Sequence, residues 1–206
     1  MGGFTFRNHR IADTLISTNL YESSIPLFLT SSRLTFHARI FKMPTIRPAT
    51  EADIQPICDL VNGFADQNLM LHRTPEQVRR ALGDFLVAVE ASQVVGCGYI
   101  AYLSPDLVEL RSLAVHPDLH GKGLGGEIVD ALVETAQQRG LRQICALTLA
   151  PHFFQRQGFQ VVDRWEISPK IWSECVYCPK FHVCDEVAVL KKLGQHIGPV
   201  SDHGNS

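Results

Sequence analysis

The sequence predicts an α/β (α+β) fold in which a mixed central sheet of about six to seven strands carries helices on both faces. Apolar residues recur at helical spacing over 51–67 and 123–139, whereas 85–115 holds short apolar or alternating runs separated by turn residues. Strands that alternate with helices in this way bury their apolar faces in a layered arrangement of helices against a sheet.

Helix caps agree with this periodicity. Four helices are expected, at 51–67, from Thr74, at 123–139 and at 151–157. Thr74 is followed by Pro75 at the first helical position and by Gln77 at the capping-box distance. Thr50 stands as the N-cap of the first helix, and Gly140 is placed to end the third.

Seven short segments have the pattern of strands. They are 45–48, 85–91, 94–103, 107–115, 144–149, 159–167 and 187–190. The three segments between 85 and 115 follow one another through the turns Ser92-Gln93 and Ser104-Pro105-Asp106, which predicts a meander. The later strands are separated by helices, so the sheet is expected to be mixed.

The charge balance excludes some classes of partner. The chain has 206 residues, with 19 Lys and Arg against 21 Asp and Glu and a formal net charge of −2. Nucleic acids and anionic membranes require a basic surface, so neither is expected as a partner. No apolar stretch approaches the roughly 18 residues of a membrane-spanning helix.

The two ends differ in character from the centre. Residues 1–42 contain five basic and two acidic residues. Ten of the 42 residues are Ser or Thr. This composition fits a disordered extension, sequence translated ahead of a true start at Met43, or a targeting segment. We expect one domain at 43–193 and a flexible polar tail at 194–206.

Six cysteines in a chain of this size do not resemble a disulfide framework, so a reducing, cytoplasmic environment is expected. Cys175, Cys178 and Cys184 lie near His182 in the sequence, and a zinc site is one interpretation of these four residues. Their spacing is more cramped than that of the usual zinc sites. We therefore expect reduced structural thiols and no metal.

A glycine-rich loop connects a predicted strand to the long helix at 123–139. Gly121, Gly123 and Gly125 carry no Cβ, so an anion can approach the backbone N–H groups at the start of that helix. This pattern predicts a pyrophosphate site, with a glycine-rich turn that binds nothing as the alternative. The spacing fits neither the Walker A loop nor the G-x-G-x-x-G dinucleotide motif.

The same loop resembles the signature [RQ]-x-x-G-x-[GA] of the GNAT superfamily of acetyl-CoA-dependent N-acetyltransferases. It stands here as His120-Gly121-Lys122-Gly123-Leu124-Gly125, after Val115-His116-Pro117. His120 departs from the usual Arg or Gln, at a position that offers loop backbone and a donor to phosphate. The resemblance covers 45–193 and implies a GNAT fold, acetyl-CoA as co-substrate and a diphosphate held by the backbone of 120–125. It also implies that the strand ending at Val115 splays from its neighbour, leaving room for the pantetheine arm.

Glu109 is the candidate general base. Alternation along the strand predicts that Glu109, Arg111 and Leu113 share one face, and a carboxylate in an apolar strand is costly unless it is paired or used. Acetyl transfer to an amine requires removal of a proton, because the amine is mostly protonated at neutral pH. The position also matches the strand glutamate of the superfamily. An ion pair of Glu109 with Arg111 or a Lys is the alternative.

The resemblance assigns two further parts of the reaction. Backbone N–H groups near Leu113, Ala114 and Val115 would polarise the thioester carbonyl. Many members of the superfamily carry a tyrosine general acid at the position of Phe154, which has no proton to give. The CoA thiolate is therefore expected to leave without a side-chain acid, or to take its proton from solvent.

Several segments together resemble the short form of N-acetylglutamate synthase. They are 71–74, 84–90, 109–115, 147–159 and 170–186. This resemblance implies transfer of acetyl to the α-amine of L-glutamate, the first step of arginine biosynthesis. Two carboxylates on the substrate call for fixed arginines. Arg111 and Arg73 are the substrate-binding candidates, and Arg156 is a third whose alternative is a surface position.

Other functions stay open at this level. Acetylation of another small amine or of a protein N-terminus is one alternative, and a non-catalytic acetyl-CoA-binding regulatory module is another. No stretch resembles the amino-acid-kinase domain of the long forms, so no arginine feedback site is expected. A homodimer is compatible with the sequence.

Overall fold

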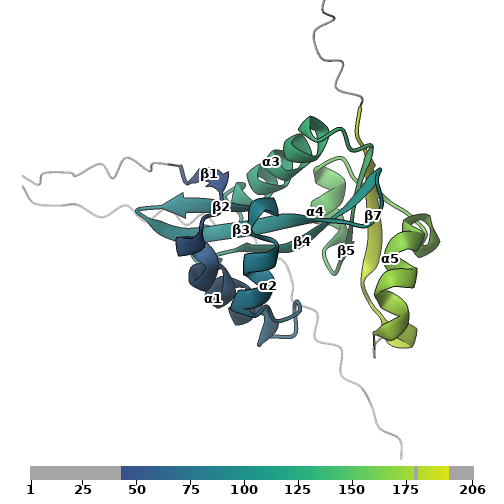
Figure 1. Cartoon of the computed structure of the whole chain (residues 1–206), viewed down its shortest axis with the longest axis horizontal. Helices are drawn as coiled ribbons and strands as arrows, with labels where there is room; N and C mark the ends of the chain where they lie inside the picture. Colours follow the sequence, from purple (N-terminus) through teal and green to yellow (C-terminus); the bar gives the residue numbers. More distant parts are fainter. Residues whose placement is uncertain (1–42, 179–180, 195–206) are drawn as a thin grey trace, which may run out of the picture. The chain divides into compact units, whose positions relative to one another are not determined.

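The structure, a computed structural model, describes residues 43–178 and 181–194. Within these ranges the chain forms one seven-stranded mixed sheet with the order β1-β2-β3-β4-β5-β7-β6 (Figure 1). This architecture confirms the predicted fold class. The expectations for residues 1–42 and for the tail from 195 lie outside the described residues.

The strands follow the predicted segments closely, with one exception. They are β1 (Thr45–Pro48), β2 (Phe85–Glu90), β3 (Gln93–Tyr102), β4 (Leu107–Val115), β5 (Gln143–Thr148), β6 (Gln160–Val161) and β7 (Val187–Lys192). The strand predicted at 159–167 was wrong beyond its first residues. The side chain of Asp163 accepts a hydrogen bond from the N–H of Trp165 at 2.9 Å and begins a 3₁₀ turn over Arg164–Ile167, which ends the strand early.

The helices cover both faces of the sheet. They are α1 (Ile54–Ala65), α2 (Pro75–Arg80), α3 (Leu124–Gln138), α4 (Pro151–Arg156) and α5 (Ser168–Ser173). Thr74 caps α2 as predicted, since its side chain accepts from the N–H of Gln77 at 3.2 Å. The short helix α5 was not predicted. None of the helices in the described part of the chain is long and apolar enough to cross a membrane.

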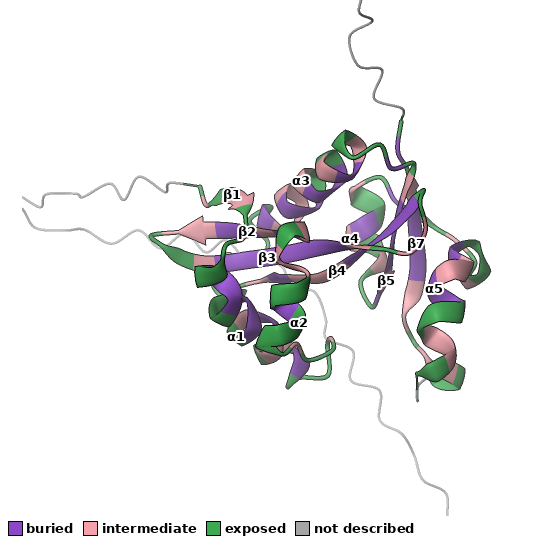
Figure 2. Cartoon of the chain, viewed as in Figure 1, coloured by how far each residue is buried: buried purple, intermediate pink, exposed green. Residues whose placement is uncertain are grey.

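Two main apolar clusters hold the helices to the sheet (Figure 2). Ile128 and Leu132 of α3 are fully buried in the first cluster, which also contains Val108 and Leu110 of β4. Ile57 and Val61 of α1 are fully buried in the second, on the opposite face. The crossing of α3 is close: a Cβ built on Gly96 of β3 would lie 2.7 Å from Cδ1 of Ile128. The two faces of β4 therefore belong to different layers.

A bulge in β4 changes which residues share a face. Cys97 pairs with Ala114 and Tyr99 pairs with Arg111, so Ser112 and Leu113 together stand opposite one residue of β3. Ser112 has a φ of 50°, in the left-handed region. The prediction that Leu113 shares a face with Glu109 and Arg111 was wrong for this reason. Leu113 packs against the α3 cluster, while Ala114 belongs to the α1 cluster.

β4 and β5 are parallel neighbours for only part of their length. The pairing runs from Leu107 with Gln143 to Glu109 with Cys145, and ends there. Both strands continue, to Val115 and Thr148. The strands thus diverge beyond Glu109, which confirms the expected splay and opens the sheet on the side that leads to the glycine-rich loop.

Candidate active site

A cleft of about 630 Å³ lies where β4 ends and α3 begins. Eight of the nine predicted coenzyme-binding residues line it: Leu113, Ala114, Val115, His120, Gly121, Gly123, Leu124 and Gly125. Lys122 is not among the lining residues. Further lining residues come from segments distant in the sequence and were not predicted. They include Phe64 and Met70, and also Phe153 and Gln157.

The start of α3 suits a diphosphate. Gly123 is the N-cap with a φ of 90°, and Gly121 has a φ of 72°. A Cβ at either position would meet no atom within 4 Å, so these glycines are required by backbone conformation and leave the approach to the helix open. The first N–H groups of a helix have no hydrogen-bond acceptor within the helix, and they lie at the positive end of the helix dipole. The residues present therefore fit a bound diphosphate.

The His120 ring is engaged by the backbone, although the sequence predicted that this position could donate to a phosphate. Its Nε2 lies 2.7 Å from the carbonyl oxygen of Val115. Because a carbonyl can only accept, Nε2 donates this hydrogen bond and is not free for an anion. The ring also stacks on Phe64, with centroids 6.0 Å apart. His120 therefore ties the loop to the end of β4 and lines the cleft.

A second cavity, of about 410 Å³, adjoins this cleft. Met70, Leu113, Ala150 and Phe153 line both spaces, so the two meet at these four side chains. The charged lining of the second cavity comes from four segments of the chain and consists of Arg73, Glu109, Arg111, Lys170, Glu174 and Glu186. We call this space the acceptor cavity.

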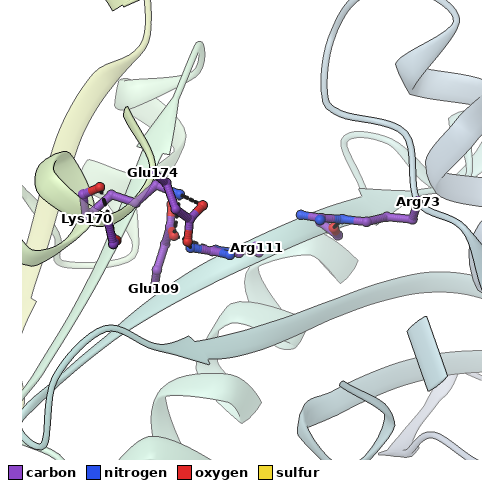
Figure 3. Close-up of polar contacts among 7 residues, drawn as sticks. Arg73, Glu109, Arg111, Lys170 and Glu174 are labelled. Atoms are coloured by element: carbon purple, nitrogen blue, oxygen red, sulfur yellow. Dashed lines mark hydrogen bonds and ion pairs between the residues drawn. The ribbon is translucent and has the colours of Figure 1, made fainter. Parts of the chain in front are cut away.

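Glu109 lies on the floor of the acceptor cavity within a ring of four charges (Figure 3). Its Oε2 pairs with Nε of Arg111 and, at 3.0 Å, with Nζ of Lys170. Glu174 closes the ring, because its Oε2 lies 2.6 Å from Nζ of Lys170 and its Oε1 pairs with Arg111. Within residues 43–178 and 181–194, no hydrogen bond reaches Oε1 of Glu109.

This arrangement combines the two interpretations of Glu109. The carboxylate forms the ion pairs that were the alternative to a catalytic role. Glu109 is nevertheless buried and lines a cavity instead of lying on a solvated surface. Both charge partners contact one oxygen and leave the other free. Oε1 is therefore the oxygen of Glu109 that is placed to accept a proton.

The contacts within the ring favour the charged forms of Lys170 and Glu174. Burial alone would lower the pKa of Lys170, but the charge of Glu109 and a hydrogen bond to Glu174 outweigh burial and raise it. Burial alone would raise the pKa of Glu174, but hydrogen bonds from Lys170 and Arg111 outweigh burial and lower it. Glu186 forms no ion pair among the described residues, and the attraction of Lys170 does not outweigh burial there. Burial, together with the charge of Glu109, raises the pKa of Glu186 and shifts it toward its neutral form.

Arg73 reaches the acceptor cavity from the opposite side (Figure 3). Its Nε donates to Oγ of Ser112 at 3.1 Å, and its guanidinium lies 5.7 Å from the ring centroid of Tyr99. Asn62 of α1 fixes the loop, because it accepts from the N–H of Arg73 at 2.8 Å and donates to its carbonyl at 3.0 Å. No carboxylate in the described ranges forms an ion pair with Arg73.

The other candidates fall in different places. Arg156 is exposed and lines the cleft at the start of α3, which we call the coenzyme cleft. It does not line the acceptor cavity, where a third substrate-binding arginine was considered. Phe154 is buried and packs edge-to-face on Phe159, with centroids 5.2 Å apart. The aromatic ring at this position has a packing contact and no acidic proton.

Lys170 and Glu174 were missed as site residues. Their i, i+4 spacing is a common ion-pair signal on a helix. Nothing in the local pattern indicates that they meet Glu109, which lies 61 positions earlier than Lys170 in the chain.

The cysteine cluster contains free thiols in the structure. Cys175 and Cys184 are half-buried and Cys178 is exposed. In the part of the chain that the structure describes, no group of three or more His, Cys, Asp or Glu side chains is arranged to hold a metal ion.

Comparison with known proteins gives the family. Residues 81–161 match the acetyltransferase (GNAT) domain. The chain is 36% identical over 148 residues to an uncharacterized N-acetyltransferase of Chlorobaculum tepidum, which covers 72% of this chain and 96% of that protein. It is 32% identical over 134 residues to an amino-acid acetyltransferase of Mycobacterium tuberculosis, which covers 64% of this chain and 76% of the relative.

A solved structure agrees with these relatives. The crystal structure of Rv2747 from Mycobacterium tuberculosis in complex with CoA superposes with a TM-score of 0.65 at 28% identity, covering 73% of this chain and 100% of that one. The chain belongs to the GNAT acetyltransferase family. This confirms the family resemblance, the GNAT fold and acetyl-CoA as the expected co-substrate.

Replacing Gly123 by Asp is expected to weaken CoA binding by at least about tenfold, because a carboxylate would stand beside the diphosphate. Gly140→Asp is the matched control. Gly140 has a φ of 76°, lies at the other end of α3 and also has open space at its Cβ position. Calorimetric titration with CoA should separate the two variants. Equal CoA affinity in both would show that the start of α3 does not hold the diphosphate.

Proposed function

We propose that this protein transfers the acetyl group of acetyl-CoA to the α-amine of L-glutamate. The observation that carries the proposal is the position of Glu109. Glu109 lines a cavity with three cations, both of its ion pairs among the described residues are on Oε2, and this cavity opens onto the coenzyme cleft. The relatives named amino-acid acetyltransferases support an amino acid as acceptor.

The charges of the acceptor cavity support a substrate with more than one carboxylate. Arg73, Arg111 and Lys170 supply three positive charges, whereas Glu109 and Glu174 supply two negative charges within the ring. Glu186 is shifted toward its neutral form by burial, which raises its pKa. L-glutamate with a protonated amine has a net charge of −1 and brings two carboxylates to these three cations. We assign one substrate carboxylate to Arg73, which has no carboxylate partner among the described residues.

Glu109 is placed to start the reaction. The α-amine enters protonated, and Oε1 of Glu109 removes one proton, directly or through a water. The nitrogen lone pair then attacks the thioester carbonyl carbon. A C–N bond forms, the C–S bond breaks, and the electron pair leaves with the CoA sulfur as a thiolate. The nitrogen, which still carries two protons after the attack, loses the second one to solvent and becomes the amide N–H.

The bulge in β4 supplies the polarising groups. Ser112 and Leu113 have no register partner in β3, and β5 has already diverged at this height. We propose that the backbone N–H groups of Ser112 and Leu113 polarise the thioester oxygen, whereas Ala114 and Val115 have register partners in Cys97 and Gly96 of β3. Since Phe154 cannot donate a proton, we propose that the thiolate leaves as such or is protonated by solvent.

The proposed product gives the chain a place in metabolism. N-acetylglutamate formation opens arginine biosynthesis, and we assign the chain to that pathway. All six cysteines are free in the structure, which suits the reducing conditions of the cytoplasm.

Glu109→Gln is expected to lower kcat for L-glutamate at least about 100-fold, the usual size of general-base catalysis, without weakening CoA binding. The loss of rate at low pH that protonation of the base causes should also disappear. Thiol release with L-glutamate, L-glutamine, L-aspartate and L-lysine measures both rate and selectivity. The exposed Glu134→Gln on α3 is the control for the change in charge.

Three outcomes would contradict the proposal in different ways. A Glu109→Gln variant that keeps the rate and pH profile of the wild type would assign the base elsewhere. A wild-type protein that acetylates L-glutamate no faster than the other three amino acids would remove the glutamate assignment. CoA binding without any amine-dependent thiol release would favour the regulatory alternative.

Arg73 and Arg156 are expected to affect different substrates. Arg73→Gln should raise KM for L-glutamate by about tenfold or more, the size of a lost charge-assisted hydrogen bond, because Arg73 lines the acceptor cavity. Arg156→Gln should raise KM for acetyl-CoA instead, because Arg156 lines the coenzyme cleft. Steady-state kinetics with each substrate varied in turn tests the pair. The reverse pattern would be inconsistent with the assignment of the two cavities.

A further inference from the structure

The four charges around Glu109 are not equally accessible. The side chains of Glu109, Lys170 and Arg111 are 6%, 11% and 16% exposed, whereas that of Glu174 is 45% exposed. Each cation contacts both carboxylates. The ring therefore has one buried carboxylate, fixed in the central strand, and one at the surface.

The backbone around Glu174 offers little to hold its carboxylate. Glu174 follows the last residue of α5 and has a φ of −136° and a ψ of −48°, outside the helical range. The 3₁₀ turn Cys175–Tyr177 begins directly after it. Among the described residues the Glu174 carboxylate is held by its pairs with Arg111 and Lys170, and because it is partly exposed, a carboxylate from solution can reach the same two cations. A carboxylate on an incoming molecule has the same chemistry as the group it would replace.

If an incoming carboxylate displaces Glu174, the acceptor cavity offers two positions for carboxylates. Arg73 stands on one side, without a carboxylate partner in the described ranges. Arg111 and Lys170 stand on the other side, with Glu109 between them and Glu174 on the solvent side. A substrate with two carboxylates can occupy both positions, and its amine then lies near the free oxygen of Glu109.

We propose that Arg111 and Lys170 form the subsite for the second carboxylate of the acceptor, and that Glu174 fills this subsite until the acceptor displaces it. This inference rests on the proposed function, because it names the site for the second carboxylate of a glutamate-like acceptor. Lys170 and Glu174 then determine specificity. A carboxylate restores the two ion pairs that Glu174 gives up, whereas an amide or an apolar side chain leaves both cations without a partner.

Glutarate tests this subsite without catalysis, because it carries two carboxylates and no amine. Calorimetry with the full chain should show that Glu174→Gln binds glutarate about fivefold more tightly than the wild type, the size of one released ion pair. Lys170→Met should bind it about tenfold more weakly, as expected for the loss of a charged hydrogen-bond partner. Glu134→Gln makes the same charge change as Glu174→Gln on the exposed surface of α3 and should leave the affinity as in the wild type.

A double variant distinguishes competition for Lys170 from a general loss of structure. If Glu174 competes for Lys170, the gain from Glu174→Gln should shrink in the Lys170→Met background, so that the two effects are not additive. Lys170→Arg retains the charge if Lys170→Met does not fold, and Glu174→Gln should then again tighten binding. Weaker or unchanged glutarate binding in Glu174→Gln would overturn the inference, because Glu174 would then be a fixed structural group or a substrate contact.

Kinetics separates this inference from the proposed function. With the wild type, slow turnover of L-glutamate relative to the other amino acids overturns the proposed function. The glutarate measurement is a binding result that does not depend on turnover. Its failure with normal L-glutamate turnover overturns the inference alone, while a lower KM for L-glutamate in Glu174→Gln supports both.

Discussion

The divergence of β4 from β5 after Glu109 is the constraint on which the rest of the structure depends. Backbone N–H and C=O groups inside a sheet are normally paired, and here the pairing between two central strands stops halfway. The opening leaves one edge of β4 free where the coenzyme cleft begins. Glu109 is the last residue of β4 that pairs with β5, so it stands at the point where these two strands separate. The proposed base and the proposed coenzyme-binding groups are thus brought together by one irregularity of the sheet.

A buried ring of charges is an expensive element, and its location suggests why it is kept. Desolvation of an ion pair often costs as much as the attraction returns, and removing one partner leaves an uncompensated buried charge worth about 3–5 kcal/mol. Glu109 is nevertheless held by two cations inside an otherwise apolar face. Our account is that Arg111 and Lys170 serve two tasks: they orient the base through Oε2, and they recognise an acceptor carboxylate in exchange with Glu174.

The features that follow from local sequence could be predicted. The glycine loop, the cap at Thr74, the meander and Glu109 on its strand each depend on residues close together in the chain. The bulge at Ser112 could not be predicted, because no glycine or proline marks it, and it moved Leu113 to the other face. The ring partners Lys170 and Glu174 depend on how the last helix folds back onto β4. Arg156 shows the same limit, because residue type alone does not tell which cavity an arginine lines.

Hydrogen exchange with and without CoA tests the central claim most directly. If the opening between β4 and β5 seats the coenzyme, CoA should slow amide exchange at 112–115 and at 121–126, while β1 at Thr45–Pro48 stays as in the free protein. The contrary result would be saturating CoA with no protection in either segment, or protection confined to other parts of the chain. Either outcome would mean that the divergence of the two strands is not what places the thioester beside Glu109.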